Sequence, residues 1–299
     1  MESETRMAVT APGVSAQQAR RRHLWRHYSQ NAITYLILGV AVVILGLPFF
    51  WMATTSLKPI QEVVIYPPHW LPSELRWENF VEAWHAAPFD RFYINSVVTG
   101  VASTVLQVLF ALFMAYAFVF IRFPAKNVLF LLVLATMMIP VEMKLVPNYL
   151  LLKELHWINT YWALIIPPAA HAFPVFVLHQ QFRTLPKDLL DAATVDGATH
   201  TQILLRVVAP MSRPLLAAVA LVSFVGRWND YLWPLIVTNK VAMRTLPIGL
   251  AYLKETQEGG NRWNLLMAGT IFVIAPILVL FIFTQKQFVE GITRGAVKG

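Results

Sequence analysis

The stretch that decides the fold is DAATVDGATHTQILLRVVAPMSRP, residues 191–214, a polar segment in an otherwise very hydrophobic chain. Pro186 and Asp188 signal the start of a helix just before it, because Asp is a good N-cap and favours the positive helix end. Gly197 is the usual signal for a helix C-terminus, and a second predicted helix, TQILLRVVAP, follows. A plain connector between helices needs about 2–8 residues, so we predict an ordered helix–turn–helix that is presented to a partner.

The rest of the chain has the composition of an integral membrane protein. Of its 299 residues, 57% are hydrophobic and 13% are charged, whereas soluble domains carry about 25% charged residues. Charge-free runs such as 92–121 and 263–285 exceed the roughly 20 residues that a helix needs to cross the hydrocarbon core. Because lipid offers the backbone no hydrogen-bond partners, we predict an all-α fold. The six predicted transmembrane helices lie near residues 33–53, 94–120, 127–147, 161–182, 212–237 and 264–285.

The basic residues predict the orientation of these helices. If the N-terminus is inside, the inner segments hold 14 of the 24 Lys and Arg but only 6 of the 16 Asp and Glu. The whole net charge of +8 then lies inside, as the positive-inside rule requires, so both termini are predicted to be cytoplasmic. The same distribution accounts for the charge without nucleic-acid binding. We predict a basic cytoplasmic tail over residues 1–28 and a transmembrane domain over residues 29–299, with a cytoplasmic loop at about 184–213.

The residue inventory predicts no chemistry of its own for this chain. There is no cysteine, and no second His or carboxylate stands at ligand spacing near His171, so no metal site is predicted. The phosphate-binding pattern G-x-x-x-x-G-K-[ST] is missing, and no Gly-Lys pair occurs at all. No nucleophile–base pair argues for catalysis. The chain is therefore expected to be neither an enzyme nor the holder of a cofactor.

Charged residues that interrupt or end the predicted spans are candidates for a solute pathway. A charge at mid-membrane costs about 2.5–3.5 kcal/mol on insertion scales, so such residues usually face a cavity or a partner. The pathway candidates are Glu142, Lys144, Arg227, Trp228, Asn229, Asp230 and Tyr231. Alternatively, the charges lie at the outer interface, Arg227 pairs with Asp230 at i,i+3, and the aromatic residues form an interfacial belt.

His171 stands in PPAAHAFP, where prolines interrupt the fourth predicted span. Broken helices often line binding sites, whereas a lone histidine in a membrane more often forms a hydrogen bond between packed helices. The sequence leaves both interpretations open. Outside the spans, WENFVEAWH and PNYLLLKELHWINTY are predicted to form short surface helices.

The opening stretch resembles the EAA loop of the permeases of ATP-binding-cassette (ABC) importers. The pattern of that loop is Glu-Ala-Ala, three residues, Gly, nine residues, Ile, one residue and Leu-Pro. This chain keeps the spacing from Asp191 to Pro210, with Asp191 in place of Glu, Val207 in place of Ile and Ala209 in place of Leu. The resemblance implies a coupling role for Asp191, Ala192, Ala193, Asp196, Gly197 and Pro210.

The resemblance extends over nearly the whole chain. SLKPIQEV with PPHWLP, WNDYLWPL at 228–235, TLPIGL at 245–250 and the closing GITRGAVKG are similar to the carbohydrate-uptake branch of these permeases. They match the second permease subunit, the type of the maltose importer's shorter permease. Within this branch, IPVEMKLVP at 139–147 and EGGNRWNLLMAG are most similar to permeases of glycerol-3-phosphate and glycerophosphodiester importers.

This resemblance implies a type I ABC importer permease in a bacterial plasma or inner membrane. The chain would pair with a second permease subunit in membrane lipid, forming half of a pathway for a sugar or a glycerol-phosphate-type solute. Two ATP-binding subunits would hold ATP and Mg²⁺ and dock on the EAA-like loop, and an extracytoplasmic solute-binding protein would deliver the solute.

Two other function classes compete with this interpretation. A secondary transporter of a small polar solute would need inverted repeats and a gradient-coupling carboxylate within a span. No repeat is visible, and only Glu142 and Asp230 qualify as such carboxylates. An intramembrane enzyme would need a convergent set of His, Asp or Glu within the spans, and the sequence offers none.

Overall fold

The computed structural model describes the backbone of residues 16–256 and 262–296, and the side chains of residues 33–255 and 262–285. These ranges contain helices and no strand, which confirms the predicted all-α fold. The helices are α1 (Ala16–Ser56), α2 (Ile60–Val63), α3 (Glu78–Ala86), α4 (Phe89–Phe120), α5 (Lys126–Ala135), η1 (Thr136–Met138), α6 (Val141–Glu154), α7 (Tyr161–Ala169), α8 (Ala172–Phe182), α9 (Lys187–Val195), α10 (His200–Ile203), η2 (Leu204–Val208), α11 (Ala209–Met211), α12 (Arg213–Trp228), α13 (Leu232–Val237), η3 (Val241–Met243), α14 (Leu246–Thr256) and α15 (Trp263–Ala296).

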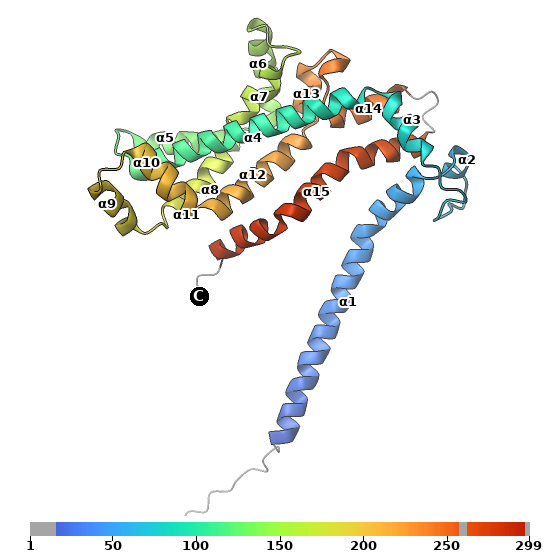
Figure 1. Ribbon diagram of the computed structural model, residues 1–299, viewed down its shortest axis with the longest axis horizontal. Coiled ribbons are helices and arrows are strands. Elements are labelled where there is room, and N and C mark those ends of the chain that lie inside the picture. Colours follow the sequence, from blue (N-terminus) through green and yellow to red (C-terminus); the bar gives the residue numbers. More distant parts are fainter. Residues whose placement is uncertain (1–15, 257–261, 297–299) are drawn as a thin grey trace, which may run out of the picture. The chain divides into compact units, whose positions relative to one another are not determined.

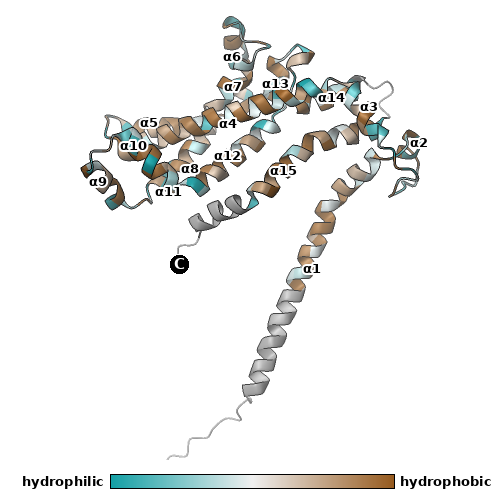
Figure 2. Ribbon diagram, in the orientation of Figure 1, coloured by the Kyte–Doolittle hydropathy of each residue, from teal (hydrophilic) through white to brown (hydrophobic). Residues whose placement is uncertain are grey.

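The chain divides into two compact units, Met1–Thr54 and Thr55–Gly299. This boundary lies inside the transmembrane domain predicted over residues 29–299. The first unit contains most of α1, whose described side chains are apolar and largely exposed from Ile33 onward. Figure 2 shows hydrophobic residues along this part of α1, as expected for a helix that meets lipid or another membrane subunit rather than water.

Within the described ranges, four helical segments are long and apolar enough to cross a membrane: Ile33–Ser56, Phe89–Phe120, Tyr161–Phe182 and Trp263–Gln285. They agree with the predicted spans near 33–53, 94–120, 161–182 and 264–285. The segment Tyr161–Phe182 consists of α7 and α8, which are separated at Ala170 and His171. The predictions succeeded here because each segment lacks charge over the full width of the hydrocarbon core.

The other two predicted spans are not single straight helices. The span predicted near 127–147 consists of Lys126–Met138 and Val141–Glu154, which meet at 101°. The bend follows from Pro140, whose ring and missing N–H end a helix. The span predicted near 212–237 ends as α12 at Trp228, and the shorter α13 follows after a break. A second bent pair precedes that break, where His200–Met211 meets Arg213–Trp228 at 84°. Counting each of the two bent pairs as one span gives up to six spans in the described residues.

Helix α4 is the centre of the second unit. It packs against α7, α8 and α12, and α12 also packs against α15 (Figure 1). The face of α4 turned toward these neighbours is buried and polar at helical spacing, with Asn95, Thr99, Ser103 and Gln107 among its residues. Small and polar residues are favoured between membrane helices because they allow close approach and hydrogen bonding.

Two prolines inside helices free backbone carbonyls that neighbouring side chains then bind. Pro167 lacks an N–H, so the Ala163 carbonyl loses its helical partner. The indole N–H of Trp233 donates to that carbonyl at 2.9 Å. Pro276 frees the Phe272 carbonyl in the same way, and the Tyr93 hydroxyl donates to it. Such bonds let broken helices remain in an apolar medium.

Candidate functional site

The polar segment quoted at the outset folds as the predicted helix–turn–helix at one end of the second unit (Figure 1). Its first helix, α9, begins at Lys187 after Pro186. Asp188 lies inside the first turn and makes no cap hydrogen bond, so it is not the N-cap that the sequence suggested. Its carboxylate favours the helix start by charge alone, since the N-terminal end of a helix is positive.

Gly197 ends α9, as predicted. Its φ of +75° lies in the left-handed region, where glycine meets no Cβ penalty. The Gly197 N–H donates to the Thr194 carbonyl at 3.0 Å, and the Ala198 N–H donates to the Ala193 carbonyl at 3.0 Å. These two bonds form a Schellman motif. The turn after α9 is therefore fixed by the backbone.

The second helix of the segment starts with a capping box that the sequence interpretation missed. The Thr199 hydroxyl accepts from the Gln202 N–H at 3.3 Å, and the Gln202 amide oxygen accepts from the Thr199 N–H at 2.8 Å. The signal was present as Thr followed three residues later by Gln. A π-helical turn over Leu204–Val208 leads to Pro210. The wider turn suits this place because Pro210 offers no N–H to a preceding carbonyl.

This second half of the segment is anchored in the core. Ile203, Leu204 and Val208 are buried in a cluster with residues of α4 and α8. The hydroxyl of Tyr116, on α4, also lies 3.1 Å from Nδ1 of His200. The anchor joins the predicted coupling segment directly to the central helix.

By contrast, α9 has no fully buried residue. Leu190 and Ala193 are partly buried against the same core cluster, whereas Val195 is 87% exposed. Of the six predicted coupling residues, Asp191, Ala192, Asp196 and Gly197 are exposed, and Ala193 and Pro210 are half-buried. The four exposed residues form a surface on the outside of the molecule, whereas Ala193 and Pro210 are partly covered by the rest of the second unit.

The pathway candidates at the end of α12 fall into two groups. Arg227 and Asp230 form the predicted i,i+3 pair, with Nη1 and Oδ2 3.0 Å apart. The other carboxylate oxygen of Asp230 accepts from the Trp233 N–H at 3.4 Å, at the start of α13. Trp228 is 2% exposed, and its indole N–H donates to the Val273 carbonyl at 3.0 Å. The structure therefore shows that Trp228 is packed between helices.

Asn229 and Tyr231 are exposed in the break between α12 and α13. Glu142 and Lys144 are exposed in the first turns of α6. His171, between α7 and α8, is exposed as well.

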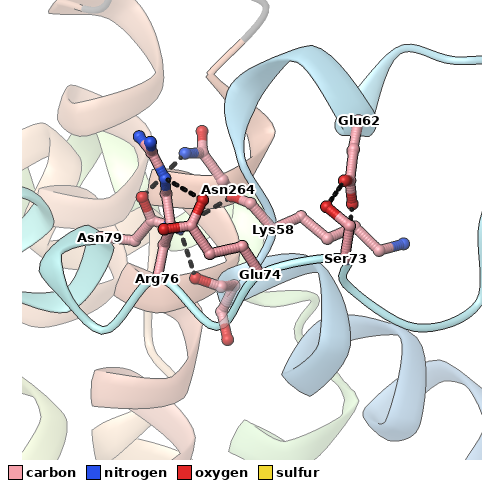
Figure 3. A network of polar contacts seen from close by, with 8 residues as sticks. Lys58, Glu62, Ser73, Glu74, Arg76, Asn79 and Asn264 are labelled. Carbon is pink, nitrogen blue, oxygen red and sulfur yellow. Dashed lines mark hydrogen bonds and ion pairs between the residues drawn. The ribbon is translucent and has the colours of Figure 1, made fainter.

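A polar network that the sequence interpretation missed holds the loop between α1 and α3, residues 57–77 (Figure 3). Lys58 is 1% exposed and donates from Nζ to the His69 carbonyl at 2.5 Å. The Asn79 amide donates to the Ser56 and Lys58 carbonyls at 2.9 Å each, and Asn264 donates to the Asn79 side-chain oxygen at 3.1 Å. Burial lowers the pKa of Lys58 from its ordinary value. These hydrogen bonds therefore connect the loop, α3 and the start of α15.

The same loop is closed by Glu62 and Ser73. The carboxylate of Glu62 accepts hydrogen bonds from both the hydroxyl and the backbone N–H of Ser73. Hydrogen bonds to the ionised form favour that form, so they lower the pKa of Glu62 from its ordinary value. The surface helix predicted at WENFVEAWH follows as α3, and the second predicted surface helix overlaps α6.

Comparison with protein families gives one match, over residues 107–294, to the family described as "Binding-protein-dependent transport system inner membrane component". Among individual proteins, the chain is 34% identical to the arabinooligosaccharides transport system permease protein AraQ of Bacillus subtilis (strain 168), covering 92% of this chain and 99% of AraQ. It is also 34% identical to the sn-glycerol-3-phosphate transport system permease protein UgpE of Escherichia coli O1:K1 / APEC, covering 87% and 94% of the two chains.

Solved structures with the same fold belong to a bacterial ABC transporter involved in the import of the acidic polysaccharide alginate. One chain superposes with a TM-score of 0.76 at 21% identity, covering 93% of this chain and 100% of the other. A chain of the alginate transporter in complex with an alginate pentasaccharide-bound periplasmic protein gives a TM-score of 0.61 at 17% identity, covering 89% and 98%. At these identities the likeness establishes the fold.

Proposed function

Since the chain belongs to the family of binding-protein-dependent transport system inner membrane components, we propose that it is the permease subunit of an ATP-driven importer and that α9 couples it to a separate ATPase subunit. The observation that carries the proposal is the structure of the polar segment, residues 187–211. A short exposed helix is ended by a fixed turn at Gly197 and backed by a second helix that is anchored in the core. Such a construction presents a rigid surface to a partner.

The two kinds of coupling residue would act differently. Asp191, Ala192 and Asp196 are exposed and would contact the ATPase subunit. Ala193, Gly197 and Pro210 would position them, through the core contact, the left-handed turn and the π-helical turn. Because the segment continues into α12, closure of the ATPase pair would move the permease as a rigid body between two states.

We propose the other subunits of the importer from the family to which the chain belongs. A second permease subunit would complete the pathway, two ATPase subunits would hold ATP and Mg²⁺, and an extracytoplasmic binding protein would deliver the solute. We propose six spans with both termini in the cytoplasm, in keeping with the bent helix pairs and the inner excess of Lys and Arg. The relatives are named as permeases of solute transport systems, which supports an importer over a self-sufficient secondary transporter.

The solute is proposed to be a sugar or a glycerol phosphate, as the names of AraQ and UgpE suggest. Glu142, Lys144, Arg227, Asn229, Asp230 and Tyr231 are the proposed pathway residues of this chain. Their positions at helix breaks support this role, because irregular backbone within a membrane is tolerated where it lines a cavity or is buried in protein.

The coupling proposal is tested by Asp191→Lys and Gly197→Pro in the reconstituted importer. We expect both variants to insert and assemble while ATP-driven uptake and solute-stimulated ATP hydrolysis fall at least about tenfold. A reversed charge opposes the contact, and Pro cannot adopt the positive φ at position 197. Glu154→Lys, an exposed reversal at the end of α6, is the matched control and should keep uptake. Unchanged uptake in both coupling variants would contradict the proposal.

A further inference from the structure

The turn between α4 and α5 holds an open cavity of about 370 Å³. This volume falls within the range of about 300–1,000 Å³ that is usual for sites of small molecules. Two lining residues are cationic, one is an amide, three are apolar and none is acidic: Arg122, Lys126, Asn127, Phe123, Ala125 and Val128. The cavity therefore has the charge and the hydrogen-bond donors to hold an anion.

The side chain of Lys126 fixes the shape of this turn. Its ammonium donates to the Val119 carbonyl at 2.9 Å and to the Ile121 carbonyl at 3.0 Å, both at the end of α4. An ammonium group has three N–H donors, so one remains for another acceptor. One wall of the cavity is therefore held in place by the fold itself.

The positive charge of the cavity is not balanced by an ion pair. Neither Arg122 nor Lys126 forms one within the part of the chain that the structure describes. The sequence contains no Asp or Glu between Asp90 and Glu142. The guanidinium of Arg122 is exposed, and its planar fork of donors matches two oxygen atoms of a phosphate. An anion from outside the chain would balance these charges.

The turn lies at a membrane surface. The span Phe89–Phe120 ends just before it, and α5 begins the bent pair that follows it. Because only residues 121–125 connect the two helices, the turn cannot extend far from the membrane. In the proposed orientation this is the cytoplasmic surface, where basic pockets beside membrane helices bind anionic lipid head groups.

An exposed apolar face of α5 starts at the cavity. Val128 lines the cavity and is 58% exposed, and Leu131 and Leu132 are 65% and 58% exposed. Residues at i, i+3 and i+4 share one face of a helix. Acyl chains attached to a phosphate in the cavity would cover this face, whereas a free phosphate would leave it bare.

We infer that the cavity binds the phosphate of an anionic phospholipid whose acyl chains lie along α5. Arg122 would bind the phosphate oxygens, and Lys126 would add its third N–H. The inference goes beyond the importer function, because it uses the position of the turn in the membrane and involves neither the solute nor the ATPase subunit.

Fluorescence quenching tests the site in the assembled importer, reconstituted in vesicles of phosphatidylcholine. The chain contains no cysteine, so Leu131→Cys, outside the cavity on the apolar face, can carry a thiol-linked fluorophore once any cysteines of the partner subunits are replaced. Phosphatidylglycerol and phosphatidylcholine with brominated acyl chains are compared at equal mole fractions, because bromine quenches a fluorophore that it contacts. We expect phosphatidylglycerol to be preferred by about fivefold or more, since the head group of phosphatidylcholine carries its own cation.

Two variants of the labelled chain locate this preference. Arg122→Gln should lower the preference for phosphatidylglycerol by about fivefold. Arg213→Gln, which removes an exposed arginine at the start of α12 and outside the cavity, is the matched control and should keep it. The same preference in both variants would overturn the inference.

The other outcomes concern what occupies the site. Equal quenching by the two lipids would overturn the inference, and so would no quenching by either, because a protein subunit would then cover α5. Inorganic phosphate, added at constant ionic strength, should leave the quenching by phosphatidylglycerol unchanged. If inorganic phosphate removed the preference instead, the cavity would be a site for a free anion and the lipid assignment would be wrong.

Discussion

At the scale of single residues, the membrane part of this chain is held by side chains that bind carbonyls freed by prolines. Tyr93 and Trp233 are the two clear cases, and each reaches from a different helix to the carbonyl four residues before a proline. The aromatic rings are packed by their neighbours, so the donor is fixed in place. Removing such a donor leaves a buried acceptor unpaired, which is more costly than the bond itself is favourable.

We therefore expect Tyr93→Phe to destabilise the complex by about 1 kcal/mol, because the Phe272 carbonyl loses its donor. In a Pro276→Ala background the same change should have a smaller effect, since the restored backbone N–H can bind that carbonyl. Thermal unfolding in detergent measures all four proteins of the cycle. Tyr231→Phe, which alters an exposed tyrosine, is the control. An equal loss with and without Pro276 would contradict the proline explanation.

Among single residues, the sequence predicted local contacts but not contacts between residues far apart in the chain. The Arg227–Asp230 pair was predicted correctly, because i,i+3 geometry is local. The burial of Trp228 was not foreseen, because it depends on Val273, which lies far along the chain.

At the scale of elements, the length of an uninterrupted apolar run predicted the straight spans correctly, but it did not predict where a span bends or breaks. The four long segments follow from charge-free runs, whereas the bend at Pro140 lies inside a stretch that is apolar enough to count as one span. The break after Trp228 lies inside the span predicted near 212–237. The proline at 140 was visible, but its effect depends on whether neighbouring helices bind the freed backbone groups. The C-terminal end of α9 was predicted correctly, because the positive φ that ends this helix is one that glycine adopts without strain.

The loop between α1 and α3, residues 57–77, offers a prediction about pH. Because the pKa of Glu62 is lowered in the folded loop, its ionised form contributes stability that is fully present above the ordinary carboxyl pKa of about 4.5. That contribution is lost as the pH falls through the lower pKa of the folded protein. We expect amide hydrogen-exchange protection in residues 57–77 to decrease as the pH falls below about 4.5.

Two variants distinguish this cause from general acid unfolding. Glu62→Gln should abolish the pH-dependent step in that loop, since the side chain no longer ionises. Glu74→Gln, which removes another exposed carboxylate from the same loop, should keep it. A step of the same size in the Glu62→Gln protein would show that another group is responsible.

At the scale of the whole molecule, the proposed orientation can be tested directly because the natural chain contains no cysteine. Single cysteines introduced by Glu74→Cys and Lys187→Cys would lie on opposite sides of the membrane, both at exposed positions. We expect an impermeant maleimide to label the first only from outside and the second only from the cytoplasmic side. Labelling of both from the same side would contradict the six-span topology with cytoplasmic termini.

The bend at Ser212 has a mechanical consequence. The helical stretch His200–Met211 meets α12 at 84°, and the corner is stiff because Ser212 is 1% exposed and its N–H is bound by the Val208 and Ala209 carbonyls. Because the two helical segments are held at nearly a right angle, a displacement along the first would rotate the second about the corner. Arg227 lies 14 residues along the second segment, about 21 Å from the corner at 1.5 Å per residue. A displacement of a few ångströms at the proposed docking end would then reach Arg227 as a sideways movement of the guanidinium, with no hinge between the two.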